Sequence, residues 1–293
     1  MGDQKLAILS VTKRCNLCCA YCRTEDMWYD VLGQKSKVVD LPKEKWIRAL
    51  DHCREVGEVL ITGGEPVEYP LFKEFLRFLA ENKIRFSLHT NGVSKKWSDV
   101  LVYFQNNNLH PDIHLSTELF ADMQKEIRGG SKLPLQFIAD VKKLNMAVEL
   151  KITLHQQLLS HIDQLKENLY SWVEKGVDSI FFQPIAPVGK HFPRGLGLDK
   201  SFIPFLVKLK GLKAKDPVLS RIIRKSEMGF DTIISLIEGN NFYKTIAEKC
   251  RVYDQIIFLN PDLQILNCKT LWDRKKGTSC ADFFDFICCG FQP

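Results

Sequence analysis

Four cysteines stand within eight positions of the stretch RCNLCCAYCR, at Cys15, Cys18, Cys19 and Cys22. Thiolates grouped this closely can bind zinc through two CxxC pairs. Zinc ribbons, however, separate the two pairs by a long stretch, so that they approach the ion from opposite sides. The alternative is that three of the four thiolates bind a [4Fe-4S] cluster, which leaves one iron atom without a protein ligand.

A second group of cysteines lies near the end of the chain, at Cys250, Cys268, Cys280, Cys288 and Cys289. The chain start has no basic segment followed by an apolar one, and no apolar run is long enough to span a membrane, so we expect a cytoplasmic protein. In a reducing compartment ten cysteines indicate metal binding rather than disulfides. Only Cys53 stands apart, in a helical pattern that predicts a buried, inert thiol.

Short apolar runs alternate with longer amphipathic ones along the first two thirds of the chain. The short runs predict strands at residues 6–12, 58–62, 84–90, 112–117, 148–154 and 178–184. The amphipathic runs predict helices near residues 43–56, 70–82, 95–107, 133–144 and 160–175. Six alternations of strand and helix indicate a parallel α/β sheet, either an open doubly wound sheet or a partial barrel.

The residues that could do chemistry follow the ends of these predicted strands. The cysteine cluster follows the first strand, and TGGEP, TNG and STE follow the second, third and fourth. The segment QPIAPVGK ends the sixth. Because active sites of parallel α/β folds lie at the carboxyl ends of the strands, we predict that these segments form one site.

The pattern changes after Lys190. A linker with Pro and Gly precedes two predicted helices, near residues 201–213 and 218–238. Beyond Cys250 the runs DQIIFLN and ILNC, joined by the turn PDLQ, predict a β-hairpin. A cysteine-bearing tail follows the hairpin.

The cysteine cluster resembles the CxxxCxxC loop of the radical S-adenosylmethionine (SAM) superfamily. Cys15, Cys19 and Cys22 fit that spacing, and Tyr21 occupies the aromatic position that the family places before the last cysteine. The resemblance implies that these three cysteines bind a [4Fe-4S] cluster whose open iron chelates SAM. It leaves Cys18 as an extra thiol.

Further motifs extend the resemblance through the first domain. The family's GGEP motif, which binds the methionyl amine of SAM, is matched by Gly63, Gly64, Glu65 and Pro66. The family's TNG motif is matched by Thr90, Asn91 and Gly92. The segment beside the adenine in many members resembles Gln183, Pro184 and residues 187–190. The fold implied is a partial (β/α)6 TIM-type barrel with a small C-terminal β-hairpin/helix domain.

Polar residues near the predicted strand ends complete the site. We expect Ser116 and Lys151 to contact the cofactor, and Glu118 to be a catalytic residue. His155 also could face the barrel interior. His89 and His114 lie inside predicted strands, where hydrogen-bonded core histidines are expected.

The second cysteine group resembles the SPASM/twitch extension of radical SAM enzymes, which carries an auxiliary iron-sulfur cluster. This resemblance implies ligation by Cys250, Cys268 and Cys280, with either Cys289 or Cys288 as the fourth ligand. Zinc binding or free thiols are the alternatives. The implied domains are a radical SAM core at residues 1–195, a helical linker at 196–245 and a twitch-like domain at 246–293.

The resemblance implies reductive cleavage of SAM to a 5'-deoxyadenosyl radical, which abstracts a substrate hydrogen atom. We expect a dehydrogenation or an epimerisation in natural-product biosynthesis, on a sugar or aminoglycoside-like alcohol. The alternatives are a maturase acting on a peptide delivered by a separate partner, an RNA-modifying enzyme and a zinc module. A reductant such as flavodoxin or ferredoxin would supply electrons. The net charge of +6 is spread along the chain and does not predict nucleic-acid binding.

Overall fold

The computed structural model describes residues 6–22, 39–54, 58–130, 132–185, 195–225, 227–238, 256–259 and 265–267. The expected adenine segment 187–190 and the five C-terminal cysteines lie outside these residues, as does the side chain of Cys53. The predictions made for them therefore remain predictions.

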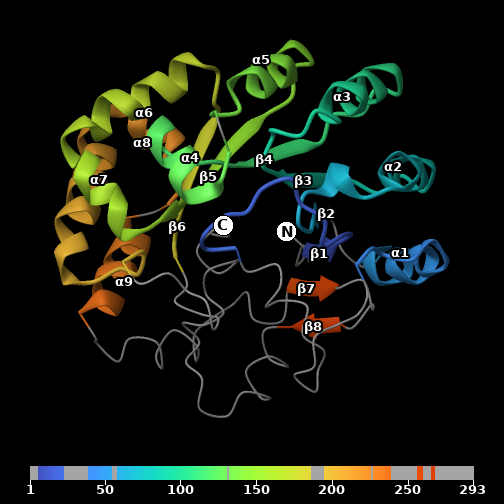
Figure 1. Ribbon diagram of the computed structural model, residues 1–293, viewed down its shortest axis with the longest axis horizontal. Helices are drawn as coiled ribbons and strands as arrows, with labels where there is room; N and C mark the ends of the chain where they lie inside the picture. The colour runs from blue at the N-terminus through green and yellow to red at the C-terminus, as the bar shows by residue number, and fades with distance from the viewer. Residues whose placement is uncertain are drawn as a thin grey trace.

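Six parallel strands form the body of a curved sheet (Figure 1). They are β1 (Leu6–Ser10), β2 (Glu58–Thr62), β3 (Phe86–Thr90), β4 (Asp112–Ser116), β5 (Val148–Leu154) and β6 (Ser179–Pro184). Their spatial order is their chain order, and each pairs in parallel with the next. In the described part of the chain β1 does not pair with β6, so the sheet is an open, partial TIM-type barrel. The predicted fold class is confirmed.

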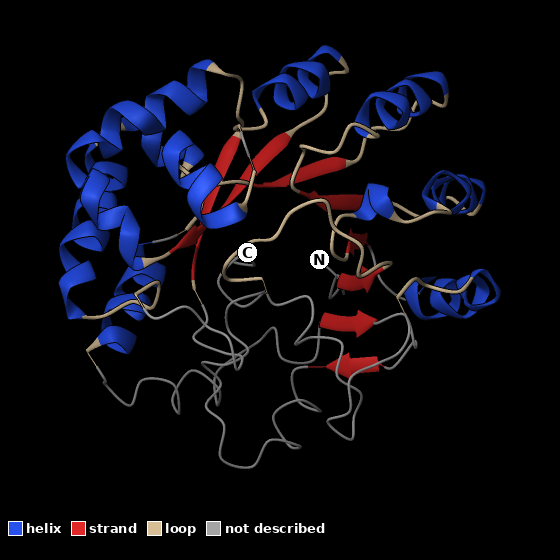
Figure 2. Cartoon of the chain, in the orientation of Figure 1, coloured by secondary structure: helices blue, strands red, loops and turns tan. Residues whose placement is uncertain are grey.

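Helices that follow successive strands cover the outer, convex face of this sheet, as Figure 2 shows. They are α1 (Trp46–Arg54), α2 (Phe72–Glu81), α3 (Trp97–Asn106), α5 (Leu135–Lys143) and α6 (Leu165–Glu174). Short 3-10 turns lie at Lys43–Lys45, Pro66–Glu68, Gln156–Gln164 and Lys200–Phe202. The later helices are α7 (Ile203–Lys215), α8 (Pro217–Ile222) and α9 (Glu227–Ile237).

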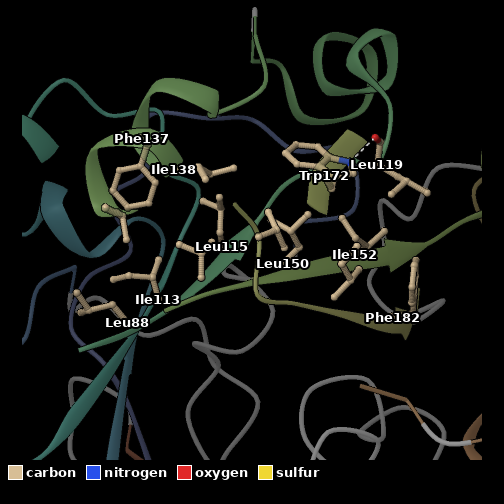
Figure 3. Packing of buried hydrophobic residues seen from close by; sticks show 14 of the residues in the cluster. Leu88, Ile113, Leu115, Leu119, Phe137, Ile138, Leu150, Ile152, Trp172 and Phe182 are labelled. Atoms are coloured by element: carbon tan, nitrogen blue, oxygen red, sulfur yellow. Dashed lines mark hydrogen bonds between the residues drawn. The ribbon is translucent and has the colours of Figure 1, made fainter. Parts of the chain in front are cut away.

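The main hydrophobic core lies between the sheet and these outer helices (Figure 3). Alternate strand residues such as Leu88, Leu115 and Leu150 point outward and pack with Phe137 and Trp172. All five are at most 5% exposed. Side chains in a strand alternate between faces, so the residues between them point to the inner face. Polar residues such as His114 and Glu149 occupy those inner positions.

Two helical predictions differ from the structure. The sequence analysis missed α4 (Ala121–Arg128), which is short and strongly charged and ends at Gly129 in the left-handed conformation. It also predicted one helix over residues 218–238, where α8 and α9 are separate. The break occurs because Ile223 is extended and forms a parallel bridge to Ile180 of β6.

The predicted C-terminal hairpin is confirmed. β7 (Ile256–Leu259) and β8 (Ile265–Asn267) pair antiparallel, with Phe258 opposite Leu266. β7 also pairs in parallel with β1, so the hairpin extends the barrel sheet. The division into three domains remains a prediction.

No helix in the described part of the chain is both long enough and apolar enough to span a membrane.

Candidate functional site

The cysteine loop begins where β1 ends and lies against the GGEP segment that follows β2. The backbone N–H of Gly64 donates to Thr12 O, and that of Glu65 donates to Arg14 O, each over 2.7 Å. A Cβ atom on Gly64 would lie 2.3 Å from Arg14 O, closer than side-chain carbon atoms can approach. The glycine is therefore required for two chain segments, about fifty residues apart, to meet.

The start of the loop is fixed by Asp40. Its carboxylate accepts a 2.6 Å hydrogen bond from Thr12 Oγ1 and pairs with Arg14 over 2.8 Å. Thr12 Oγ1 in turn accepts from the Arg14 backbone N–H. These contacts determine the direction in which the chain leaves β1 toward the cysteines.

The thiols of the loop have the chemistry that an iron-sulfur cluster requires. Cys15, Cys18, Cys19 and Cys22 are all free thiols. In the part of the chain that the structure describes, no three His, Cys, Asp or Glu side chains converge on a single metal ion. A [4Fe-4S] cluster does not need that convergence, because each cysteine binds a different iron atom.

Donors around Cys15 support the same ligand role. Leu17 N lies 3.4 Å and Asn91 Nδ2 3.8 Å from Cys15 Sγ, and both donate to the sulfur. Hydrogen bonds of this kind tune iron-sulfur clusters. Burial raises the pKa of Cys15 to about 11 and also raises the pKa of Cys19. Metal binding must therefore displace protons from these thiols.

Glu65 is completely buried beside the loop. Its carboxylate accepts a 2.7 Å hydrogen bond from Thr90 Oγ1 and a 2.8 Å hydrogen bond from Asn91 N. Burial raises the pKa of Glu65 to about 7, although the Asn91 and Thr90 donors oppose the shift. The GGEP and TNG motifs thus meet in space around one carboxylate, which could receive a cation.

A buried polar network fixes the other end of the loop. The Tyr21 phenol donates to Glu118 Oε1 over 2.5 Å and accepts from Arg128 Nη1 over 3.1 Å. The other Glu118 oxygen lies 2.9 Å from His155 Nε2. Glu118 and His155 are both 0% exposed. We call Tyr21, Glu118, Arg128 and His155 the Tyr21 network.

The network is charged as well as hydrogen-bonded. Burial alone would lower the pKa of Arg128, but Tyr21, Cys19 and Glu118 outweigh it, so the guanidinium is a permanent cation. Burial raises the pKa of Tyr21, which keeps its phenol protonated. The Ala20 N–H also donates to Ile127 O over 2.7 Å, so α4 holds the loop through its backbone too.

The remaining predicted cofactor residues lie on β4, β5 and β6. Ser116 and Lys151 are opposite each other in register, as are Lys151 and Phe181. Lys151 Nζ pairs with Glu149 over 2.5 Å and lies over the Phe181 ring. Gln183 donates to Thr153 Oγ1 over 3.4 Å, and Pro184 ends β6.

Sequence reasoning missed Arg128 and Gln124, since both belong to the missed helix. Gln124 Oε1 accepts from Glu118 N and from Thr117 Oγ1, and so fixes the segment after β4. Met123 and Ile127, four residues apart, and the terminal Gly129 were the available helix signals. No local signal indicates that Arg128 contacts Tyr21, because 107 residues separate them.

Comparison with known proteins identifies relatives at the level of family and fold. A family model described as the Radical SAM superfamily matches residues 9–180. A curated protein of Methanopyrus kandleri, described as a probable GTP 3',8-cyclase, is 38% identical over 89 residues. That match covers 29% of this chain and 26% of the relative.

Two solved structures share the fold. Streptococcus suis SuiB bound to precursor peptide SuiA has a TM-score of 0.64 at 16% identity, covering 95% of this chain and 62% of SuiB. Native anSMEcpe with bound AdoMet has a TM-score of 0.63 at 19% identity, covering 90% of this chain and 75% of that one. This chain therefore spans less than two thirds of the SuiB chain with bound peptide.

Proposed function

The chain belongs to the radical SAM superfamily, and from that premise we propose that it binds a [4Fe-4S] cluster through Cys15, Cys19 and Cys22. The ligand assignment rests on one observation: the cysteine loop is hydrogen-bonded to the GGEP segment, beside the buried Glu65. This arrangement brings a thiol-rich loop next to a carboxylate suited to an ammonium group.

The residues proposed to hold SAM lie around that contact. Glu65 accepts from the ammonium group of the methionine half, while Gly63 and Gly64 let the backbone approach it closely. Asn91 links Glu65 to Cys15, since it donates to both. The other proposed contacts are Tyr21, Pro66, Thr90, Ser116, Lys151, Gln183 and Pro184.

The Tyr21 network positions the cluster loop in this proposal. Glu118 is the central acceptor: Tyr21, which itself accepts from Arg128, donates to one carboxylate oxygen, and His155 contacts the other. Glu118 is the second residue after the end of β4 and completes the proposed catalytic set. When bound, the cluster and SAM supply a 5'-deoxyadenosyl radical that removes a hydrogen atom from the substrate.

We propose a dehydrogenation or epimerisation of a small polar molecule, with a sugar or aminoglycoside-like alcohol as the substrate. An auxiliary iron-sulfur cluster held by Cys250, Cys268, Cys280 and either Cys289 or Cys288 would accept or relay an electron. A reductant of the flavodoxin or ferredoxin type would supply the reducing electron.

A peptide substrate is the second candidate. SuiB was solved with precursor peptide SuiA, and anSMEcpe with the Cp18Cys peptide, and both share this fold. In this reading a separate partner delivers the peptide. The relative described as a probable GTP 3',8-cyclase adds a nucleotide as a further substrate to test.

Iron and sulfide counts on anaerobically reconstituted protein test the proposal. We expect about eight irons per chain, falling to about four in the Cys15/Cys19/Cys22→Ala triple variant. About four irons in the wild type and none in the triple variant would support the cluster at Cys15, Cys19 and Cys22 and would contradict the auxiliary cluster. Equal counts in both proteins, with reductive SAM cleavage unaffected, would overturn the proposed ligand set.

A further inference from the structure

The end of helix α4 lies against the loop that carries the cluster cysteines. Ile127 O accepts a 2.7 Å hydrogen bond from the backbone N–H of Ala20. A Cβ atom on Gly129 would lie 3.6 Å from Cys18 N and 3.6 Å from Cys18 O, so the helix end is directly beside the loop backbone. Arg128 stands between these two contact residues. It is therefore the side chain that α4 brings to the middle of the cysteine loop.

The Arg128 guanidinium is buried without a direct ion pair in the described part of the chain. The residue is 6% exposed, its Nη1 donates to the Tyr21 phenol, and its Cζ lies 5.9 Å from the centre of the Tyr21 ring. The phenol, not the guanidinium, contacts Glu118. Arg128 Nε is buried and has no hydrogen-bond partner among the described residues. Because a buried cation normally needs an anion in direct contact, the site suits an anionic group that the protein carboxylates do not supply.

The charge of Arg128 acts mainly on a cluster ligand. Burial raises the pKa of Cys19, and Arg128 opposes that shift more strongly than Cys22 or Glu118 adds to it. In return, burial alone would lower the pKa of Arg128, whereas Tyr21, Cys19 and Glu118 raise it, in that order of strength. The Cys19 thiolate is therefore under a net positive influence from this pair of buried charges.

A buried cation beside a cluster ligand favours the more negative form of the cluster. Reduction moves one electron from the proposed flavodoxin- or ferredoxin-type reductant to the cluster and breaks no bond, so it adds one negative charge beside Cys19. Net charge, hydrogen bonds and solvent exposure set the potential of an iron-sulfur cluster. Arginine stays protonated even when buried, and charges interact more strongly there than in water.

We infer that Arg128 raises the reduction potential of the cluster held by Cys15, Cys19 and Cys22. Arg128 does not bind the cluster, and it acts through its charge. Glu118 acts in the opposite direction, and the Tyr21 phenol keeps the two charges apart. The inference rests on the proposed function, because it concerns the same cluster, and it goes beyond positioning of the loop, which requires no net charge.

Redox titration of the full-length, anaerobically reconstituted protein, followed by electron paramagnetic resonance of the reduced cluster, tests the inference. The signal to follow is the one that the Cys15/Cys19/Cys22→Ala triple variant lacks. In Arg128→Gln we expect the ratio of reduced to oxidised cluster at a fixed potential to fall about tenfold, which is a shift of about 59 mV to lower potential. The control Arg77→Gln removes an exposed arginine on α2 and should leave the potential unchanged.

Glu118→Gln separates an effect of charge from an effect of structure. The new side chain can still accept from Tyr21 but carries no negative charge, so we expect the potential to rise. A disturbed loop would instead shift the potential of Arg128→Gln and Glu118→Gln in the same direction. The double variant Arg128→Gln/Glu118→Gln leaves neither buried charge unbalanced, and its potential should lie below that of Glu118→Gln. This comparison isolates Arg128 even where Arg128→Gln alone does not fold.

Three results would overturn the inference. They are an unchanged or raised potential in Arg128→Gln, shifts of the same direction in the two single variants, and a double variant whose potential is not below that of Glu118→Gln. With a cluster signal that the triple variant lacks, any of these removes only the role of Arg128. If the wild type and the triple variant give the same signals, the proposed function fails first, and the inference fails with it.

Discussion

The phenol of Tyr21 lies 2.5 Å from Glu118 Oε1 and donates to it, although 97 residues separate the two in the sequence. Tyr21 stands among the clustered cysteines, and Glu118 is the second residue after the end of β4. The hydrogen bond therefore joins the cysteine loop to the carboxyl edge of the sheet. Arg128 donates to the same phenol, and His155 contacts the other Glu118 oxygen, so the loop is held by a buried, charged network.

Removing the carboxylate of this network should destabilise the protein strongly. In Glu118→Ala, buried Arg128 loses its counter-charge and His155 loses its partner. We expect the free energy of unfolding to fall by about 3–5 kcal/mol, as for other broken buried ion pairs. Chemical denaturation of the purified protein measures the change. A loss below about 1 kcal/mol would mean that the network is not buried in solution.

Tyr21→Phe should cost less, about 1–3 kcal/mol, because it removes only the phenol from a buried hydrogen-bonded set. Tyr170→Phe is the comparison variant, since its half-buried phenol donates to Asp216 outside the Tyr21 network. We expect a smaller change in that variant. Equal effects of the two substitutions would contradict a special role for Tyr21.

Gly64→Ala should displace the cysteine loop. The added Cβ would lie 2.3 Å from Arg14 O and 2.7 Å from Lys13 O, and backbone cannot yield as a flexible side chain does. We expect the reconstituted variant to retain less iron and to lose SAM cleavage. Gly211→Ala is the control, because no neighbouring atom lies within 4 Å of its added Cβ. Full iron content in Gly64→Ala would show that the close approach is dispensable.

SAM affinity should rise with pH across neutrality. The pKa of Glu65 is raised to about 7, mainly by burial, so its carboxyl is largely protonated at pH 6 and ionised at pH 8. The ionised form attracts the ammonium group of SAM. Equilibrium dialysis with labelled SAM at pH 6, 6.5 and 7 measures the effect, below the pH at which the α-amino group of SAM loses its own proton. In Glu65→Gln the slope should disappear, and an unchanged slope would assign the titration to another group.

The same carboxyl should also affect folding. Its pKa in the folded protein exceeds the ordinary value of 4.5, so the folded state binds more protons between pH 4.5 and about 7. The contribution of Glu65 to stability therefore falls as the pH rises through that window. Denaturation curves at pH 5 and pH 7 should show a smaller difference for Glu65→Gln than for the wild type.

Cys18 should be dispensable for the first cluster. The family spacing uses Cys15, Cys19 and Cys22, and Cys18 is an exposed thiol beside Gly129. We expect Cys18→Ala to retain iron and SAM cleavage and Cys19→Ala to lose both. The reverse result would assign the middle ligand to Cys18.

The sequence by itself determined the order of the six strands, the motifs at their ends and the C-terminal hairpin. Each of these depends on residues close together in the chain. An apolar run of five to seven residues already predicts a buried strand, and parallel alternation brings the strand ends to one edge. The shared edge predicts that GGEP and TNG lie close together, whereas the hydrogen bonds from Thr90 and Asn91 to Glu65 are seen only in the tertiary structure.

Only the tertiary structure decided which polar residues meet. Helix α4 is short and strongly charged, so its sequence pattern did not predict a helix. The contact between Arg128 and Tyr21 could therefore not be predicted from the sequence. His89 and His114 are hydrogen-bonded as the sequence analysis expected, but their place on the inner face of the sheet depends on the register of neighbouring strands. A shift of one residue would turn them to the other face of the sheet. Register is set by packing across the whole sheet, which local sequence does not encode.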